Sequence, residues 1–539
     1  MPSSAEIQRN LIQRVNVGDS LTRAAARRPA ALALVDGPRR LTYREFNRLV
    51  NRFARGLAGR GYSRGDALAL ASGNSIEFLV TYYACAKLGV VCVPVNLGWR
   101  ADEVAYVLGH SRARGIVIES QLLPALAETV TKQPGICDVI VARGTGGDST
   151  PRSDEISAAI AFGDLADGDD AEPECFVDDR DPLSYLYTSG TTSFPKGVVG
   201  NHTAIYLESL SMAVEARFNE TDRFVAMMPM FHTAQLNCHC TPAVMVGAAI
   251  YIMRGFDAGT LLSLIESERI TQIFGLPMMY RLMLEHPDID QRDLSSLRRA
   301  LYAMATMPQA QLERCLERFG CDFYLLFGQT EMSPTATLFR PEHQLSHAGA
   351  VGTPVVNVQV AIMGETGSLL PPGEEGEIVY RGPHTLTEYL SNEEATDEAF
   401  AHGWFHSGDI GRVDPDGLLW FSDRRKDVIK TGGENVASIE VEKAIYACAP
   451  DIAEAVVVGL PHERWTEAIT AIVVPAPGTS VSPDELLARM RSSLAPYKLP
   501  KAVIAVDELP RTSTGKIQKN VLRDRYASYY ADGGSEPHD

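Results

Sequence analysis

One stretch of the chain, residues 187–197, combines hydroxyl side chains, two glycines and a lysine. It follows a short apolar run at residues 183–186, which predicts a strand. Backbone N–H groups, side-chain O–H groups and a mobile positive charge are donors that suit a phosphate. The Walker A spacing G-x-x-x-x-G-K-[ST] is absent, so the stretch predicts a polyphosphate site of another kind. The candidate ligands are Thr188, Ser189, Gly190, Thr191, Thr192 and Lys196.

Four more short motifs follow this loop along the chain. They are FGQTE at residues 327–331, GWFHSGD at 403–409, DRRKD at 423–427 and PRTSTGK at 510–516. This ordered set spans nearly the whole chain and closely resembles the acyl-adenylate-forming (AMP-binding) superfamily. That superfamily includes acyl-CoA synthetases, adenylation domains of peptide synthetases and luciferases. The resemblance implies an ATP-dependent enzyme that activates a carboxylic acid as an acyl-adenylate.

The resemblance assigns the residues that would surround ATP. Lys196 would neutralise the β and γ phosphates, and Thr330 would lie close to the α-phosphate. Glu331 would hold Mg²⁺, which offsets the charge that develops when pyrophosphate leaves. Phe327 takes the position of the aromatic ring that stacks on adenine, where tyrosine is more usual, and Gly328 follows it.

The same resemblance places a second group of residues near the ribose, the reacting carboxylate and coenzyme A. Asp409 would accept hydrogen bonds from the ribose hydroxyls, assisted by Arg424. Lys516 would bridge the acyl carboxylate and the α-phosphate during adenylation. Gly432 and Gly433 belong to a loop that swings in for the thioester step, where glycines let pantetheine approach the backbone.

Three positions depart from the family pattern. Ser193 replaces a glycine commonly found in the phosphate loop, and a left-handed conformation there would cost serine roughly 1 kcal/mol. Residues 303–306, Ala-Met-Ala-Thr, stand where the family usually has Gly-Gly-Ala-Pro beside adenine. Thr466 also stands where glycine is usual. The contacts to the adenine edge are therefore less well defined by the sequence than those to the phosphates.

The acyl pocket opens, by resemblance, at Pro-Met-Phe-His, residues 229–232. Adenylation domains for amino acids place an aspartate soon after this aromatic residue to pair with the substrate ammonium. The chain offers His232 and Thr233 instead, which disfavours an amino acid substrate. His232 is a catalytic candidate that would gate the pocket. Gln235 and Asn237 could meet a polar substituent, so hydroxylated aromatic, steroid-like and carnitine-type acids stay open.

Methionines gather in the segments expected to surround this pocket. Flexible thioethers fit irregular apolar ligands, which favours a fatty or aryl acid, and core packing is the alternative role. The residues are Met227, Met228, Met230, Met278, Met279, Met304 and Met307.

The residues and the resemblance together predict an acid:CoA ligase that forms acyl-AMP and then acyl-CoA, releasing AMP and pyrophosphate. The expected ligands are a hydrophobic carboxylic acid, ATP, Mg²⁺ and coenzyme A. One alternative is a stand-alone adenylating enzyme that loads an acyl carrier protein. Another is a catalytically silent nucleotide-binding scaffold, which the joint presence of Lys196, Glu331, Asp409 and Lys516 disfavours. A homodimer is left open.

Composition limits the remaining possibilities. The net charge of −18 disfavours nucleic acid as a partner, since a phosphate backbone attracts surplus Lys and Arg. Nine scattered cysteines suit reduced thiols in a cytosolic protein. The N-terminus shows no signal-peptide pattern, and the longest apolar run, residues 242–253, is too short for a membrane helix. We expect a cytoplasmic protein without a transmembrane segment.

The elements that must position these residues follow an α/β pattern. Apolar runs such as residues 67–71 alternate with helical patterns such as 43–59, which predicts doubly wound parallel sheets. Glycines and prolines in residues 352–417 punctuate short strands and predict a small β-barrel or distorted sheet. We therefore expect a large domain over residues 1–424 and a smaller, mobile α+β domain over 425–539, with Lys426 at the hinge. Residues 144–179 are expected to form an exposed, mobile connection.

Overall fold

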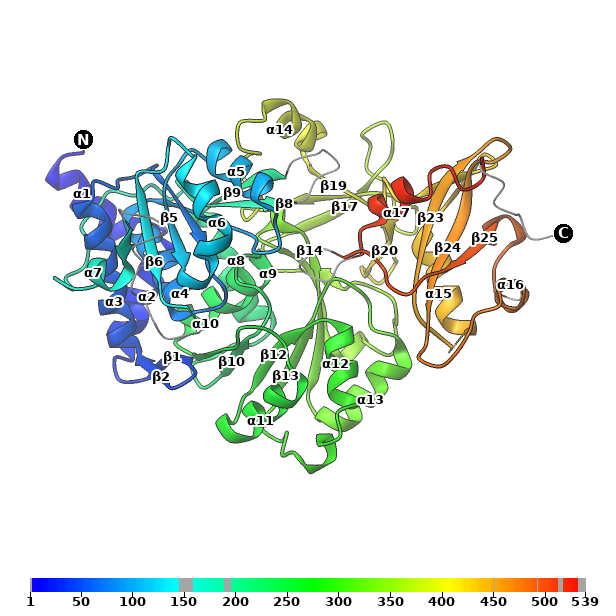
Figure 1. Ribbon diagram of the computed structural model, residues 1–539, viewed down its shortest axis with the longest axis horizontal. Helices are drawn as coiled ribbons and strands as arrows, with labels where there is room; N and C mark the ends of the chain where they lie inside the picture. The colour runs from blue at the N-terminus through cyan, green and yellow to red at the C-terminus, as the bar shows by residue number, and fades with distance from the viewer. Residues whose placement is uncertain are drawn as a thin grey trace. The chain divides into compact units, whose positions relative to one another are not determined.

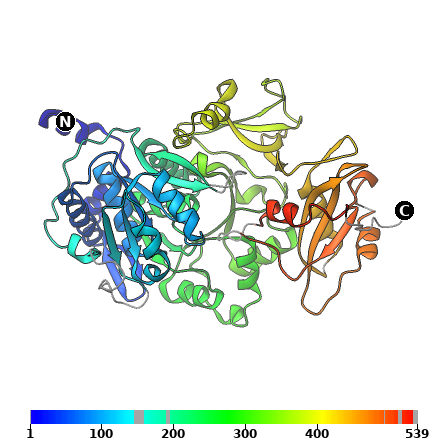
Figure 2. The same cartoon turned by 45° about the horizontal axis from the view of Figure 1, so that its top comes forward.

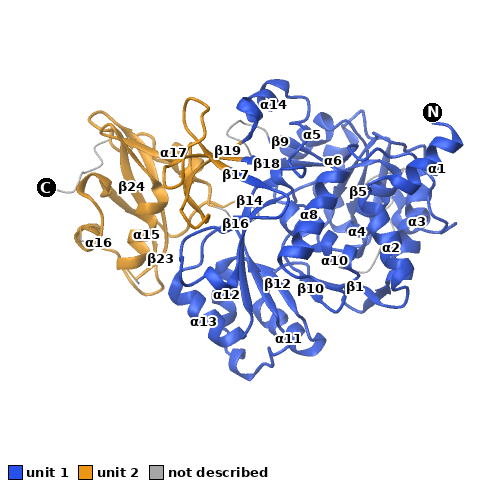
Figure 3. Ribbon diagram, turned by 180° about the vertical axis from the view of Figure 1, so that it is seen from behind, with its two compact units in different colours: residues 1–360, 380–405 blue, residues 361–379, 406–539 orange. Residues whose placement is uncertain are grey.

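The computed structural model describes residues 2–144, 159–188, 195–449, 451–491, 493–511 and 517–531 (Figure 1). The chain divides into two compact units (Figure 3). Unit 1 contains residues 1–360 and 380–405, and unit 2 contains residues 361–379 and 406–539. The expected domain boundary after residue 424 stays a prediction.

Unit 1 contains a seven-stranded sheet in the order β7–β6–β5–β3–β4–β8–β9. Its strands are β3 (Ala67–Ala71), β4 (Val91–Pro94), β5 (Ala113–Glu119), β6 (Asp138–Ala142), β7 (Ile160–Ala161), β8 (Pro182–Thr188) and β9 (Lys196–Asn201). Neighbours from β7 to β8 run parallel, whereas β8 and β9 are antiparallel. The predicted strands at residues 67–71 and 183–186 are confirmed.

A nine-stranded sheet, also in unit 1, has the order β16–β15–β14–β13–β12–β10–β11–β1–β2. Its strands are β1 (Leu32–Asp36), β2 (Arg39–Thr42), β10 (Arg223–Ala226), β11 (Ala249–Ile252), β12 (Gln272–Gly275), β13 (Arg299–Tyr302), β14 (Asp322–Gly328), β15 (Thr335–Phe339) and β16 (Thr353–Pro354). The run from β1 to β14 is parallel, and helices pack around both sheets (Figures 1 and 2). The prediction of a large α/β domain built on parallel sheets is confirmed.

The helices of unit 1 connect these parallel strands, which cannot be joined by tight turns. They are α1 (Ser4–Gln13), α2 (Val17–Arg27), α3 (Tyr43–Gly59), α4 (Ile76–Leu88), α5 (Ala101–His110), α6 (Leu123–Thr131), α7 (Phe162–Leu165), α8 (His202–Glu215), α9 (Thr233–Gln235), α10 (Thr241–Val246), α11 (Ala258–Glu268), α12 (Pro277–Leu284), α13 (Gln309–Phe319) and α14 (Glu393–Ala399). In the part of the chain that the structure describes, no helix has the length and apolar character needed to cross a membrane.

Helix α3 shows how local signals set an element. The Thr42 hydroxyl accepts a hydrogen bond from the Glu45 N–H, and the Glu45 carboxylate accepts one from the Thr42 N–H at 2.8 Å. This capping box satisfies backbone donors that the first helical turn leaves unpaired. Phe46, Val50 and Phe53 then recur on the buried face. The predicted helix at residues 43–59 is confirmed with both of its bounds.

The described residues 159–179 are partly exposed, as expected, but contacts with α3 and α4 anchor them at Phe162 and Glu172. The Phe162 ring stacks on Phe53 at 4.2 Å between centroids. Glu172 accepts a hydrogen bond of 2.6 Å from Lys87, whose side chain is 1% exposed and also donates to Asn47 and Asn51. A buried ammonium without such partners would cost several kcal/mol, so this ion pair fixes the segment to α3 and α4.

Unit 2 holds most of a four-stranded sheet in the order β17–β18–β19–β20, which matches the sheet alternative of the prediction for residues 352–417. A second sheet has the order β22–β21–β24–β23, with β25 parallel to β24. The strands are β17 (Gln359–Met363), β18 (Gly376–Arg381), β19 (Phe405–Val413), β20 (Leu419–Arg424), β21 (Ile429–Thr431), β22 (Glu434–Val436), β23 (Ile452–His462), β24 (Thr466–Pro475) and β25 (Ala502–Ala505). The helices are α15 (Ser438–Cys448), α16 (Pro483–Met490) and α17 (Lys519–Arg525). The prediction of a smaller α+β part is confirmed.

Thr466, the first residue of β24, has a left-handed backbone with φ of 68°. A β-branched side chain rarely adopts this conformation because Cβ crowds the carbonyl oxygen. The position is the one where the family pattern has glycine. Its neighbour Trp465 accepts a backbone hydrogen bond of 2.9 Å from Gly432, so the strained residue is tied to the β21–β22 hairpin.

Replacing Thr466 with glycine should relieve this strain and stabilise unit 2 by about 1 kcal/mol. We expect Thr466→Gly to raise the midpoint of the unfolding transition of unit 2 by about 2–4 °C in scanning calorimetry of the full chain. Thr466→Ala keeps a Cβ atom, so it should recover only a small part of that increase. An unchanged or lowered midpoint in Thr466→Gly would contradict the strain.

Candidate active site

The ends of the hydroxyl-rich loop face each other across two antiparallel strands. Thr188 at the end of β8 pairs directly with Lys196 at the start of β9. Tyr187 pairs with Gly197, and a Cβ atom on Gly197 would lie 3.2 Å from both the Tyr187 ring and Leu390. Close packing of the two strands thus holds Thr188 and Lys196 at the end of the hairpin where the loop begins and ends. The predicted ligands Ser189, Gly190, Thr191 and Thr192, and the departure at Ser193, lie outside the described residues.

A short extended segment, residues 386–390, runs antiparallel beside β9. Thr387 N–H donates to the Val199 carbonyl at 2.9 Å, and Val199 N–H donates to Glu388 at 3.0 Å. Leu390 N–H donates to the Gly197 carbonyl at 2.8 Å, and Tyr389 forms a bridge with Val198. This backbone ladder sets the position of Tyr389 relative to Lys196.

Glu331 lies in a short 3₁₀ turn, Thr330–Met332, and is attached to the same segment. Its carbonyl accepts a hydrogen bond of 2.6 Å from Leu386 N–H, and its Oε1 accepts one of 3.0 Å from the Tyr389 hydroxyl. The Lys196 Nζ lies 5.0 Å from the centroid of the Tyr389 ring. The structure therefore brings together Lys196 and Glu331, two predicted site residues, through a third that the sequence did not indicate.

The FGQTE motif follows the geometry of β14. Phe327 pairs with Thr337 on β15, and Gly328 has φ of 155°. A Cβ atom on Gly328 would lie 2.0 Å from the Pro334 carbonyl oxygen, so only glycine fits. This turn places Thr330 and Glu331 immediately after the end of the strand that carries Phe327.

Glu331 offers one carboxylate for a metal ion. Among the described residues, no group of three or more His, Cys, Asp or Glu side chains could hold a metal, and no donor contacts Glu331 Oε2. Mg²⁺ in nucleotide sites is usually held by one or two carboxylates together with phosphates and water rather than by a protein cage. A single carboxylate with one free oxygen therefore fits a Mg²⁺ ion that arrives with ATP.

His232 is neutral in this structure. Its Nε2 is buried without a hydrogen-bond partner in the described part of the chain, and its ring contacts Phe231. Burial lowers the pKa of His232 to about 4. An uncharged imidazole beside an aromatic ring suits a pocket for an apolar ligand.

Gln235 and Asn237 are not available for a substrate, which corrects the expectation drawn from their sequence position. Both are 1% exposed. The Gln235 side-chain carbonyl accepts from Met228 N–H at 3.1 Å. Asn237 accepts from the Tyr82 hydroxyl and donates to Thr233, each at 3.0 Å. Buried amides with satisfied hydrogen bonds hold the backbone in place.

The seven methionines differ in burial, and Met279 is half-buried. Met227, Met228, Met230 and Met307 are at most 8% exposed and fill the core of unit 1. Met278 is 40% and Met304 is 60% exposed. Met304 also has φ of 74°, in the left-handed region, within the segment where the family has two glycines. The segment thus keeps a glycine-like backbone with a larger side chain.

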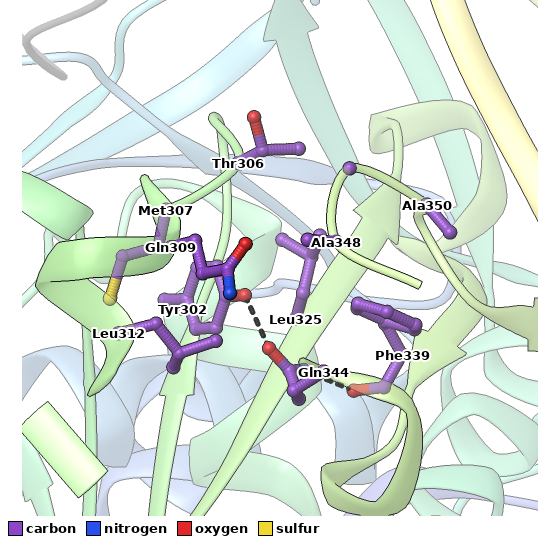
Figure 4. Close-up of a pocket in the computed structure, with 11 residues that line it drawn as sticks. Tyr302, Thr306, Met307, Gln309, Leu312, Leu325, Phe339, Gln344, Ala348 and Ala350 are labelled. Carbon is purple, nitrogen blue, oxygen red and sulfur yellow. Dashed lines mark hydrogen bonds between the residues drawn. The ribbon is translucent and has the colours of Figure 1, made fainter. Parts of the chain in front are cut away.

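A small pocket lies beside that segment (Figure 4). Thr306 and Met307 line it together with residues of β13, β14 and α13. The Tyr302 hydroxyl donates to Gln344 at 2.7 Å, and Gln344 donates to the Phe339 carbonyl at 2.8 Å. These polar groups satisfy one another. Thr306 and Met307 come from segments predicted to lie near adenine or the acyl group, whereas none of the described phosphate, ribose or metal ligands lines the pocket.

Unit 2 carries the residues predicted to contact ribose. Asp409 on β19 pairs with Arg424 on β20, and Arg424 Nε lies 3.2 Å from Asp409 Oδ1. Asp409 is 3% exposed. Glu377, which the sequence did not indicate, accepts hydrogen bonds of 3.0 Å from Gly408 N–H and from His406, and so orders the turn before Asp409.

The glycines predicted for the thioester step form the tip of a hairpin in unit 2. Gly432 and Gly433 join β21 to β22 with φ of 60° and 89°, as a two-residue turn of this kind requires. A Cβ atom on Gly432 would lie 3.1 Å from the Trp465 ring. At the expected hinge, Arg523 donates to the Lys426 carbonyl and pairs with Asp427. Lys516 lies outside the described residues.

Comparison with known proteins shows which family the chain belongs to. Residues 21–390 match the family model described as AMP-binding enzyme, and residues 440–516 match the AMP-binding enzyme C-terminal domain. The chain is 36% identical over 510 residues to a feruloyl-CoA synthase of an Amycolatopsis species, covering 95% of this chain and 99% of that protein. It is 35% identical over 518 residues to the long-chain-fatty-acid–CoA ligase FadD13 of Mycobacterium tuberculosis, with the same coverage.

A solved structure shows the same fold. The anthranilate CoA ligase AuaEII in complex with anthranoyl-AMP superposes with a TM-score of 0.87 at 26% identity, covering 97% of this chain and 99% of that one. The matching family models, the curated relatives and this structure lead to one conclusion: the chain belongs to the AMP-binding enzyme family, whose members here include acid:CoA ligases.

Proposed function

We propose that this chain is an ATP- and Mg²⁺-dependent acid:CoA ligase that converts a hydrophobic carboxylic acid into its CoA thioester. The observation that supports it most is that Tyr389 contacts both Glu331 and Lys196, the residue at the start of β9 where the hydroxyl-rich loop ends. A cation and a metal-binding carboxylate side by side suit a polyphosphate that carries Mg²⁺.

The reaction proceeds in two displacements. A carboxylate oxygen of the acid attacks the α-phosphorus of ATP, the bond to the β-phosphate oxygen breaks, and pyrophosphate leaves. The thiol of coenzyme A then loses its proton and attacks the carbonyl carbon of the acyl-adenylate, and AMP leaves. Lys196 would neutralise the departing pyrophosphate, and Lys516 would hold the carboxylate and the α-phosphate together. Mg²⁺ at Glu331 would supply further neutralising charge.

The acid is proposed to be a fatty or aryl acid. The relatives are named for ferulate and long-chain fatty acids, and the structural neighbour for anthranilate. A neutral His232 next to Phe231 adds no charge to the predicted pocket region. With Gln235 and Asn237 committed to internal hydrogen bonds, the structure gives no support to a strongly polar substituent at those positions.

The proposed reaction needs only three small-molecule partners, namely the acid, ATP and coenzyme A. A cytoplasmic location would supply all three. An acyl carrier protein as the acceptor is the second candidate function, because the same adenylate could react with a carrier thiol. A homodimer stays open as an assembly.

Product analysis by mass spectrometry tests the proposal. Purified protein is incubated with ATP, Mg²⁺ and a panel of fatty, aryl and short-chain acids, with and without coenzyme A. We expect acyl-AMP without coenzyme A and acyl-CoA with it. Acyl-AMP that persists in the presence of coenzyme A would favour carrier loading, and no product from any acid would favour the silent scaffold.

Lys516→Ala should lower the rate of acyl-AMP formation by about 10²–10³-fold, because one charge that stabilises the transition state is lost. The rate is measured as acid-dependent exchange of labelled pyrophosphate into ATP. Lys132→Ala removes an exposed lysine paired with Glu128 and serves as the matched control with an unchanged rate. Equal rates in Lys516→Ala and the control would contradict the assigned role.

The low pKa of His232, about 4, predicts how this residue responds to pH. The folded-state pKa lies below the unfolded value of about 6.5, so its stabilising contribution is complete above about pH 6.5 and is lost as pH falls toward 4. We expect thermal unfolding midpoints to fall more between pH 6.5 and 4 in the wild type than in His232→Asn. Between pH 6.5 and 8, both proteins should show the same pH profile of kcat/KM. A step in that range that only the wild type shows would contradict a neutral His232.

A further inference from the structure

Tyr389 lies between two side chains of opposite charge. Its hydroxyl donates to Glu331 Oε1 at 3.0 Å, and its ring faces Lys196, whose Nζ is 5.0 Å from the ring centroid. In the described part of the chain, Lys196 and Glu331 each contact Tyr389 and form no ion pair with each other. Without the ring, a flexible lysine side chain this close to a carboxylate would be free to move toward it.

The position of Tyr389 is fixed by the backbone on both sides. Its N–H donates to the Thr396 hydroxyl at 3.0 Å, and it bridges Val198 in β9. The flanking Leu390 N–H donates to Gly197. Since β9 also begins with Lys196, the backbones of Tyr389 and Lys196 belong to one ladder.

The Tyr389 phenol donates its single O–H to Glu331 Oε1 at 3.0 Å. An O–H group that donates to one carboxylate oxygen fixes the orientation of that carboxylate and leaves the other oxygen for a cation. The negative face of the ring attracts the lysine ammonium.

We propose that Tyr389 is a positioning residue that keeps Lys196 and Glu331 apart and oriented so that the lysine meets phosphate and the carboxylate meets the metal ion of the nucleotide. This inference rests on the proposed function, in which Lys196 and Glu331 contact Mg²⁺-bound ATP. Direct pairing of the two residues would cancel both charges and close the site to the nucleotide. The hydroxyl and the ring have separable roles, the first toward Glu331 and the second toward Lys196.

Binding of ATP with Mn²⁺ as the metal probe, without acid or coenzyme A, tests this proposal independently of turnover. Calorimetric titration of ATP and the EPR signal of free Mn²⁺ give the affinities for nucleotide and metal. Tyr389→Phe removes only the hydroxyl, so we expect about tenfold weaker Mn²⁺ binding and a smaller change in ATP affinity measured without metal. Tyr389→Leu also removes the ring, so both affinities should fall by at least tenfold as Lys196 moves to Glu331.

Two controls separate positioning from general stability. Tyr280→Phe removes a buried hydroxyl that donates to the Leu301 carbonyl at 2.7 Å in the same unit, and it should leave both affinities unchanged. In a Glu331→Gln background, Tyr389→Phe should cause no further loss of Mn²⁺ binding, because the two residues act through one hydrogen bond. If Tyr389→Leu does not fold, the Mn²⁺ and ATP affinities of Tyr389→Phe test the proposal on their own.

Affinities in Tyr389→Phe and Tyr389→Leu equal to those of the wild type would overturn the inference, as would a lowered unfolding midpoint with unchanged affinities. Additive losses in the Glu331→Gln background would overturn it too. A wild-type chain that binds no ATP with Mn²⁺ and yields no acyl-AMP would instead overturn the proposed function on which the inference rests.

Discussion

The antiparallel ladder between β9 and residues 386–390 is the contact on which the site in unit 1 depends. It joins the end of the hydroxyl-rich hairpin to the segment that holds Glu331 through the Leu386 N–H and the Tyr389 hydroxyl. Motifs that lie more than a hundred residues apart in sequence are thereby placed together by backbone hydrogen bonds. Those bonds are geometrically strict, so side chains attached to them need little further ordering when a ligand binds.

Buried titratable side chains in both units either contact groups of opposite charge or polarity or are neutral. Lys87 reaches three oxygen acceptors in the core of unit 1, and Asp409 is paired with Arg424 in unit 2. His232 stays neutral because burial lowers its pKa to about 4. The pair Lys196 and Glu331 is different, since Tyr389 contacts both side chains, one through its ring and the other through its hydroxyl.

Local signals in the sequence predicted the elements well. The capping box at Thr42 and the helical spacing after it defined α3, and apolar runs defined β3 and β8. Features that depend on contacts distant in sequence were missed. The Lys87–Glu172 pair orders a segment whose composition indicates a loop, and Tyr389 lies in a glycine- and proline-rich stretch without clear periodicity. Thr466 and Met304 stand where the family pattern has glycine, and both have positive φ. The backbone at these two positions therefore has the conformation that favours glycine.

In the proposed reaction the acid attacks the α-phosphorus of ATP, and oxygen transfer measures this step directly. An acid labelled with ¹⁸O in its carboxylate is converted to acyl-CoA with ATP and Mg²⁺, and the labelled products are analysed by mass spectrometry. We expect one ¹⁸O atom in AMP and none in pyrophosphate, because the attacking carboxylate oxygen stays on the α-phosphate when the thiol displaces AMP. Label in inorganic phosphate, or unlabelled AMP alongside acyl-CoA, would contradict it.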